Sequence, residues 1–117
     1  MSQTVRFQET LRRLVIFPEG LVEAGFGPGL AGTSSLDART VALLRVAVSV
    51  AIGSSAACLQ WSASRALAAG ATKDEITDVL LAIVPVAGLG RIVSAAPEVA
   101  TALDYDVESA LEEPNDF

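Results

Sequence analysis

The chain has 117 residues, 51% of them hydrophobic, and a formal net charge of −6 at neutral pH. This length predicts one domain, large enough to bury a sizeable core. Residues 1–103 contain 8 basic and 8 acidic residues, so the whole excess of negative charge lies in residues 104–117. Because a neutral body with an acidic tail offers no basic surface to a phosphate backbone, no nucleic-acid binding is expected.

The apolar stretches are too short to cross a membrane. The longest, residues 46–52 and 79–90, fall below the roughly 18 residues that a spanning helix needs, so no membrane partner is expected. Charged residues such as Glu9 and Arg12 interrupt the N-terminal segment, which argues against a secretory signal. A single cysteine cannot form an internal disulfide, and we expect a cytoplasmic protein.

Residues 4–15 predict an amphipathic helix. Its apolar residues recur at the spacing of one helix face, and we interpret that face as core packing: Phe7, Leu11, Leu14 and Val15. Pro18 fits the first turn of a short second helix that Gly25 would end.

Residues 25–35 predict a loop that contains the pattern Gly-x-Gly-x-x-Gly over residues 27–32. The dinucleotide fingerprint needs a preceding strand and an acidic residue roughly 20 positions further on. No strand is predicted before it, and apolar Ile52 stands at the acidic position. We therefore interpret these glycines as turn formers and expect no cofactor.

Residues 36–52 carry two conflicting signals. Val46, Val48, Val50 and Ile52 alternate with small residues, and this period of two taken alone favours a strand. We predict a helix, because no clear second strand exists for pairing, with Ser34 or Ser35 as its N-cap. Arg45 would then lie in an apolar setting and need a partner; a structural salt bridge is favoured over an anchor for a substrate carboxylate.

Residues 54–79 predict a helix, a tight turn and a second helix. The first helix is rich in Ala and Leu and carries the only cysteine, Cys58. Gly70 supplies the positive φ that ends it, and Thr72 with Glu75 forms a capping box for the next helix.

Beyond the capping box, Ile76, Val79, Leu80 and Ile83 form the apolar face of that second helix. Pro85 is expected to kink or end it, and a closing helix is predicted over residues 89–103, interrupted by Pro97. The acidic tail predicts only a turn at residues 107–111.

The helix, the Ala69-Gly-Ala-Thr72 turn and the acidic helix start resemble the core of the carboxymuconolactone decarboxylase and alkylhydroperoxidase D superfamily, over roughly residues 36–103. The resemblance implies an all-α, compact bundle of about five or six helices, with a buried helix through residues 46–52, that assembles as a homo-trimer or homo-hexamer. A high mean hydropathy of +0.49 independently favours an oligomer. We divide the chain into an N-terminal helical extension with its Gly-rich loop (1–35), this core (36–103) and an acidic tail (104–117).

In the hydroperoxidase branch, the helix before the turn carries Cys-x-x-Cys-x-x-x-His, and its three positions fall on Ser55, Cys58 and Ser62. The upstream glutamate of that branch falls on Leu43, and the histidine of the decarboxylase branch falls on Ser62. The chain contains no histidine and no second cysteine. The disulfide relay and the acid–base chemistry that the resemblance would imply are therefore unavailable in their usual form.

Three functions stay open. The first is an oligomeric structural or binding protein for a small apolar or carboxylate ligand, with four candidate pocket residues: Arg45, Ser55, Trp61 and Ser62. The second is a one-cysteine peroxidase, in which Cys58 is catalytic, is activated by Arg45 or a helix N-terminus, and is resolved by an external thiol. The third is a non-redox enzyme for a small lactone or carboxylate, with Arg45 or Arg65 as anchor. No metal site is expected, because the sequence offers neither a zinc ligand set nor clustered core carboxylates.

Overall fold

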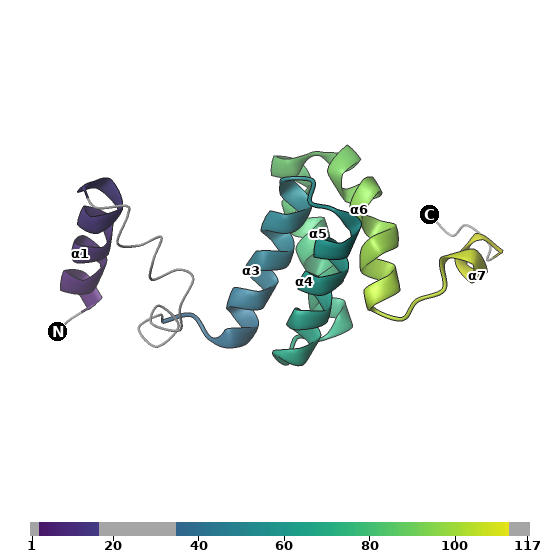
Figure 1. Cartoon of the computed structure of the whole chain (residues 1–117), viewed down its shortest axis with the longest axis horizontal. Helices are drawn as coiled ribbons and strands as arrows, with labels where there is room; N and C mark the ends of the chain where they lie inside the picture. The colour runs from purple at the N-terminus through teal and green to yellow at the C-terminus, as the bar shows by residue number, and fades with distance from the viewer. Residues whose placement is uncertain (1–2, 17–34, 113–117) are drawn as a thin grey trace. The chain divides into compact units, whose positions relative to one another are not determined.

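The computed structural model describes residues 3–16 and 35–112, and within these ranges it contains six α-helices and no strand (Figure 1). The predicted all-α fold of about five or six helices is confirmed. The helices are α1 (Gln3–Ile16), α3 (Ala38–Ala51), α4 (Ala56–Ala68), α5 (Lys73–Ala87), α6 (Leu89–Ala102) and α7 (Val107–Leu111). The chain divides into two units, Met1–Ser35 and Leu36–Phe117. The predicted helix at residues 18–25 and the Gly-rich pattern at residues 27–32 lie outside the described residues.

Helix α1 forms as its amphipathic pattern predicts, and Glu9 accepts from Arg12 and Arg13 on its polar side, each at 3.1 Å. Its apolar face is more than half exposed, from Phe7 through Val15. Helix α1 is the only described helix of its unit, so the interpretation of this face as core packing stays a prediction.

Helix α3 resolves the conflicting signals of residues 36–52 in favour of a helix. Val46 and Val50 are each 1% exposed, whereas Val48 is 57% exposed. Residues four apart share a helix face and residues two apart do not, so the alternation has no structural consequence. The N-cap is Asp37, which accepts from the Thr40 backbone N–H at 2.8 Å; the prediction of Ser35 is wrong, and Ser34 lies outside the described residues.

The core lies among α3, α4, α5 and α6, with α4 packed against α3 and α6, and α3 against α5. Ile76 of α5 and Val99 of α6 are among its most deeply buried side chains. Ala63 and Ala66 of α4 are fully buried, and their small side chains let α4 approach its neighbours closely. The predicted apolar face of α5 points inward at Ile76 and Leu80.

The turn between α4 and α5 has the predicted local chemistry. Gly70 has a φ of 99°, which side chains other than glycine rarely adopt. The Thr72 hydroxyl accepts from the Glu75 N–H at 3.0 Å, while the Glu75 carboxylate accepts from the Thr72 N–H at 2.9 Å. Glu75 also accepts from Arg39 of α3 at 2.8 Å, so this cap connects α5 to α3. The capping box is thus confirmed.

Two prolines lie inside helices. Pro85 does not end α5, which continues for two more residues to Ala87. The helix ends before Gly88, whose φ is 89°. Helix α6 contains Pro97 and ends one residue before the predicted limit. In the acidic tail, the turn predicted at residues 107–111 is the short helix α7, capped by the Asp106 side chain.

Candidate functional site

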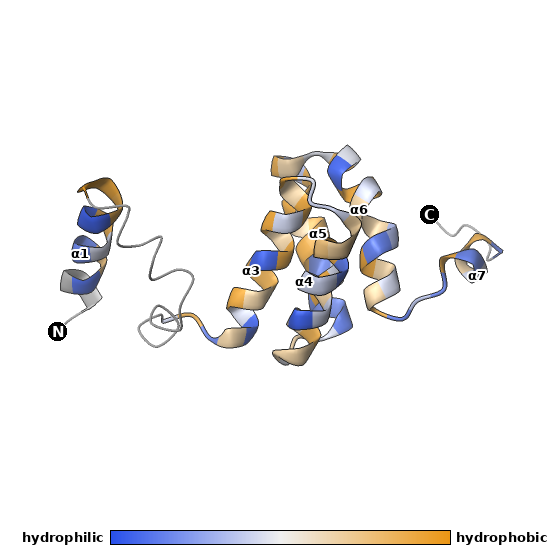
Figure 2. Ribbon diagram, in the orientation of Figure 1, coloured by the Kyte–Doolittle hydropathy of each residue, from blue (hydrophilic) through white to orange (hydrophobic). Residues whose placement is uncertain are grey.

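Helices α3 and α4 together line a cavity of about 430 Å³. We call it the α3–α4 cavity, and its walls are Leu36, Val41, Leu44, Arg45, Val48, Ser49, Trp61 and Ser62. The apolar side chains belong mainly to the outward side of α3, along which hydrophobic residues are frequent (Figure 2). The volume lies in the lower part of the range of small-molecule pockets.

Among the described residues that line this cavity, Arg45 is the only titratable one. It is exposed, and it forms no hydrogen bond or ion pair within the described part of the chain. The favoured sequence interpretation, a structural salt bridge at Arg45, is therefore wrong for the described residues. The geometric reason is that Arg39, six residues earlier on α3, faces α5 and pairs with Glu75 instead.

Trp61 and Ser62 contribute the α4 side of the cavity. Trp61 is 61% exposed, and the guanidinium carbon of Arg65 lies 5.6 Å from the centre of its ring, a cation–π contact between residues four apart on one helix. Ser62 is only 4% exposed, and its hydroxyl donates to the Leu59 carbonyl at 3.1 Å. The Ser62 hydroxyl therefore already donates a hydrogen bond within α4. Trp61 contributes a large apolar surface to the cavity wall.

Ser55 and Cys58 lie outside the α3–α4 cavity. Ser55 is the N-cap of α4, and its hydroxyl accepts from the Cys58 backbone N–H at 3.3 Å. The Cys58 side chain is exposed in the first turn of α4. The structure therefore brings Arg45, Trp61 and Ser62 together and leaves Ser55 and Cys58 apart from them.

The chain as a whole was compared with protein families. The model of the carboxymuconolactone decarboxylase family matches residues 17–102. The chain belongs to the carboxymuconolactone decarboxylase family. This match begins well before residue 36, where the motif resemblance begins. Comparisons with curated proteins and with solved structures each found no match.

In this member of the carboxymuconolactone decarboxylase family, the positions that carry chemistry in the hydroperoxidase branch do not converge on one pocket. Leu43 is half-buried against the core, Ser62 is buried and Cys58 is exposed. The motif positions Ser55, Cys58 and Ser62 share a face of α4 that is about 60° wide. That face lies at the boundary between core and solvent, so Cys58 is exposed although Ser62 is buried.

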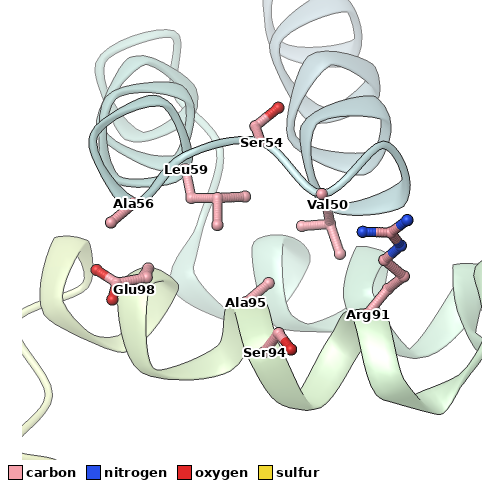
Figure 3. A pocket seen from close by; sticks show the side chains of 9 residues that line it. Val50, Ser54, Ala56, Leu59, Arg91, Ser94, Ala95 and Glu98 are labelled. Atoms are coloured by element: carbon pink, nitrogen blue, oxygen red, sulfur yellow. The ribbon is translucent and has the colours of Figure 1, made fainter.

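Sequence reasoning missed a second group of polar residues, which lies on α6. Arg91, Ser94 and Glu98 line a cavity of about 400 Å³ together with the turn between α3 and α4 (Figure 3). They belong to no motif. Their spacing of three and four residues was the available signal, because it places polar side chains on one face of an apolar helix.

Among residues 3–16 and 35–112, no group of His, Cys, Asp and Glu side chains is arranged to hold a metal ion. No described helix combines the length and apolar character that crossing a membrane requires.

Proposed function

We propose that this family member binds a small carboxylate with an apolar body in the α3–α4 cavity, and that it does not perform the thiol chemistry of the hydroperoxidase branch. The observation that carries the proposal is the cavity wall itself. It joins one guanidinium without a described acidic partner, Arg45, to the apolar surfaces of Leu44, Val48 and Trp61.

Arg45 supplies the charged contact. A guanidinium presents a planar fork of N–H donors that matches the two oxygens of a carboxylate. Because no described acidic side chain occupies that fork, a ligand carboxylate would not have to displace one. The contribution of such a charged hydrogen bond is about 1.5–3 kcal/mol.

Trp61, Leu44 and Val48 supply the apolar contact. All three are at least half exposed in the single chain, so a ligand can still remove their surface from water. Burying about 100 Å² of apolar surface is worth about 2.5 kcal/mol. The ligand loses translational and rotational freedom on binding, which offsets part of these contributions, so we expect a weak complex with a Kd of about 1 mM or higher.

The two catalytic alternatives have less support. For the one-cysteine peroxidase, Cys58 lies in the first turn of α4, so the helix N-terminus considered as an activator is present. No described side chain forms a hydrogen bond or ion pair with the thiol, and Cys58 does not line the cavity, so Arg45 does not contribute to activation. The non-redox enzyme needs a general acid or base near the anchored ligand. The wall offers only a guanidinium and the hydroxyls of Ser49 and Ser62, none of which is an efficient base.

Trp61 is the only tryptophan of the chain, so its fluorescence reports on this cavity alone. We expect benzoate to change that fluorescence saturably with a Kd of about 1 mM or higher, and the neutral analogue benzamide to bind about tenfold more weakly. Replacing Arg45→Gln should weaken benzoate binding by about tenfold or more. The matched control is Arg39→Gln, on the same helix but outside the cavity wall.

Equal affinity for benzoate and benzamide would overturn the assignment of a carboxylate ligand. An unchanged benzoate titration of the Arg45→Gln variant would overturn the role of Arg45.

We also infer that the chain assembles into a homo-trimer or homo-hexamer. Large apolar side chains are exposed well beyond the cavity, on α5 and α6: Leu81, Val86, Leu89 and Val93. A small monomer rarely leaves so much apolar surface in water.

A further inference from the structure

The cavity beside α6, which we call the α6 cavity, has charged side chains of opposite sign at its two ends. Arg91 and Glu98 are seven residues apart on α6, about 10 Å along the helix axis, and they do not pair with each other. Figure 3 shows both beside the cavity, with Ser94 and Ala95 between them. The cavity is therefore a polar slot whose floor includes Val50, Leu59 and Ala95.

The Arg91 end lies against the turn between α3 and α4. The guanidinium of Arg91 lies against Gly53, whose φ is 71°, and a Cβ at position 53 would collide with it. Arg91 forms no hydrogen bond or ion pair with any described residue. Its N–H donors are therefore open to a ligand, and Ser54 from the same turn lines the cavity beside Gly53.

The Glu98 end is held by α4. The side-chain amide of Gln60 donates to one carboxylate oxygen of Glu98 at 2.7 Å. The other oxygen accepts no hydrogen bond from a described residue. Glu98 is thus positioned at the cavity with acceptor capacity left, and Gln60, as a neutral amide, does not cancel its charge.

We propose that the α6 cavity binds a short zwitterion, with its carboxylate at Arg91 and its ammonium group at Glu98. Ser94 lies on the same face between the two charges, where its hydroxyl can contact the ligand. A simple anion would satisfy Arg91 but leave Glu98 unpaired, and a simple cation would do the reverse. Only a ligand with both charges, joined by a short apolar spacer, complements the two ends and the floor together. This site goes beyond the carboxylate site at Arg45 and shares no lining residue with it.

The test uses the full chain labelled with ¹⁵N and titrated with 5-aminopentanoate, which carries both charges on an aliphatic spacer. We expect saturable amide shifts around residues 53–54 and 91–98, while pentanoate and pentylamine, which carry one charge each, bind about tenfold more weakly. Arg91→Gln and Glu98→Gln should each weaken 5-aminopentanoate binding by about tenfold. Glu98→Gln keeps an acceptor for Gln60, and Lys73→Gln, which removes an exposed cation at the start of α5 outside both cavity walls, serves as a matched control.

Circular dichroism and the thermal midpoint of each variant establish that it is folded before its titration is interpreted. Pentanoate binding as tightly as 5-aminopentanoate, with no effect of Glu98→Gln, would replace the zwitterion with a simple anion and overturn the proposal. The absence of saturable shifts around α6 in the folded wild-type chain would overturn it as well. Because benzoate binding is followed at Trp61, failure of one site is distinguishable from failure of the other.

Discussion

Cys58 shows how a side chain can keep its place in a family pattern without keeping its chemistry. It lies exposed in the first turn of α4. Its backbone N–H donates to the Ser55 hydroxyl, but its thiol forms no hydrogen bond with a described side chain. The N-terminus of α4 lies beside this thiol, but the chain has neither a histidine to act as a base nor a second cysteine to resolve an oxidised thiol. Arg45, the cation considered for this role, lines a cavity that Cys58 does not reach.

We therefore predict that the wild-type protein consumes peroxide with an external thiol no faster than the Cys58→Ser variant does. A coupled peroxide assay at neutral pH measures both rates. A sulfenic acid trapped in the wild type after about one equivalent of peroxide would contradict this prediction and favour the one-cysteine peroxidase.

Among the helix elements, the turn at Gly70 allows a clean test of backbone conformation. Gly70 has a φ of 99°, and a Cβ at this position would meet nothing within 4 Å, so Gly70→Ala adds strain without a clash. We expect it to lower the free energy of unfolding by roughly 1–2 kcal/mol. Gly90 lies in α6 with equally open surroundings, and Gly90→Ala should raise it by about 0.5 kcal/mol. Urea unfolding measures both; a change of the same sign in the two variants would show that backbone strain is not the cause.

The capping box of α5 makes stability depend on pH. The hydrogen bond from the Thr72 N–H, together with Arg39, holds the pKa of Glu75 below its ordinary value of 4.5. A pKa lowered by folding means that this contribution is complete above about pH 5 and is lost as the pH falls through the folded-state pKa. Stability conferred by Glu75 is therefore greatest near neutral pH.

For this reason, Glu75→Gln should be less stable than the wild type above about pH 5, and the difference should shrink toward about pH 3. Urea midpoints measured across this range test the expectation. Asp78→Asn, on the same helix and without a described partner, is the matched control. A difference between Glu75→Gln and the wild type that stays constant with pH would contradict the assignment.

At the scale of the whole molecule, the exposed apolar side chains of α5 and α6 predict assembly. The four-helix core already buries its own central residues, such as Val46 and Ile76, so the exposed residues have no remaining partner among the described residues of unit Leu36–Phe117. Light scattering at micromolar concentration should give a mass of three or six times 12.1 kDa. A mass of one chain would contradict the oligomer.

Much of the fold follows from local signals in the sequence. The Gly70 stop and the Thr72–Glu75 capping box depend on residues within about one helical turn of each other, so the sequence alone determined them. The same locality explains the failures. Asp37 and Ser35 are both good N-caps, and only the path of the chain into α3 selects between them.

What only the tertiary structure decided is which side chains meet across helices. Arg45 has no described partner because Arg39 is the residue that faces Glu75, and Cys58 is excluded from a cavity that Trp61 and Ser62 line. Arg91 reaches Gly53 only because α6 packs beside the turn between α3 and α4. These contacts join residues up to about 40 positions apart in the chain, and their geometry is set by how the buried faces of the helices pack, which no local pattern encodes.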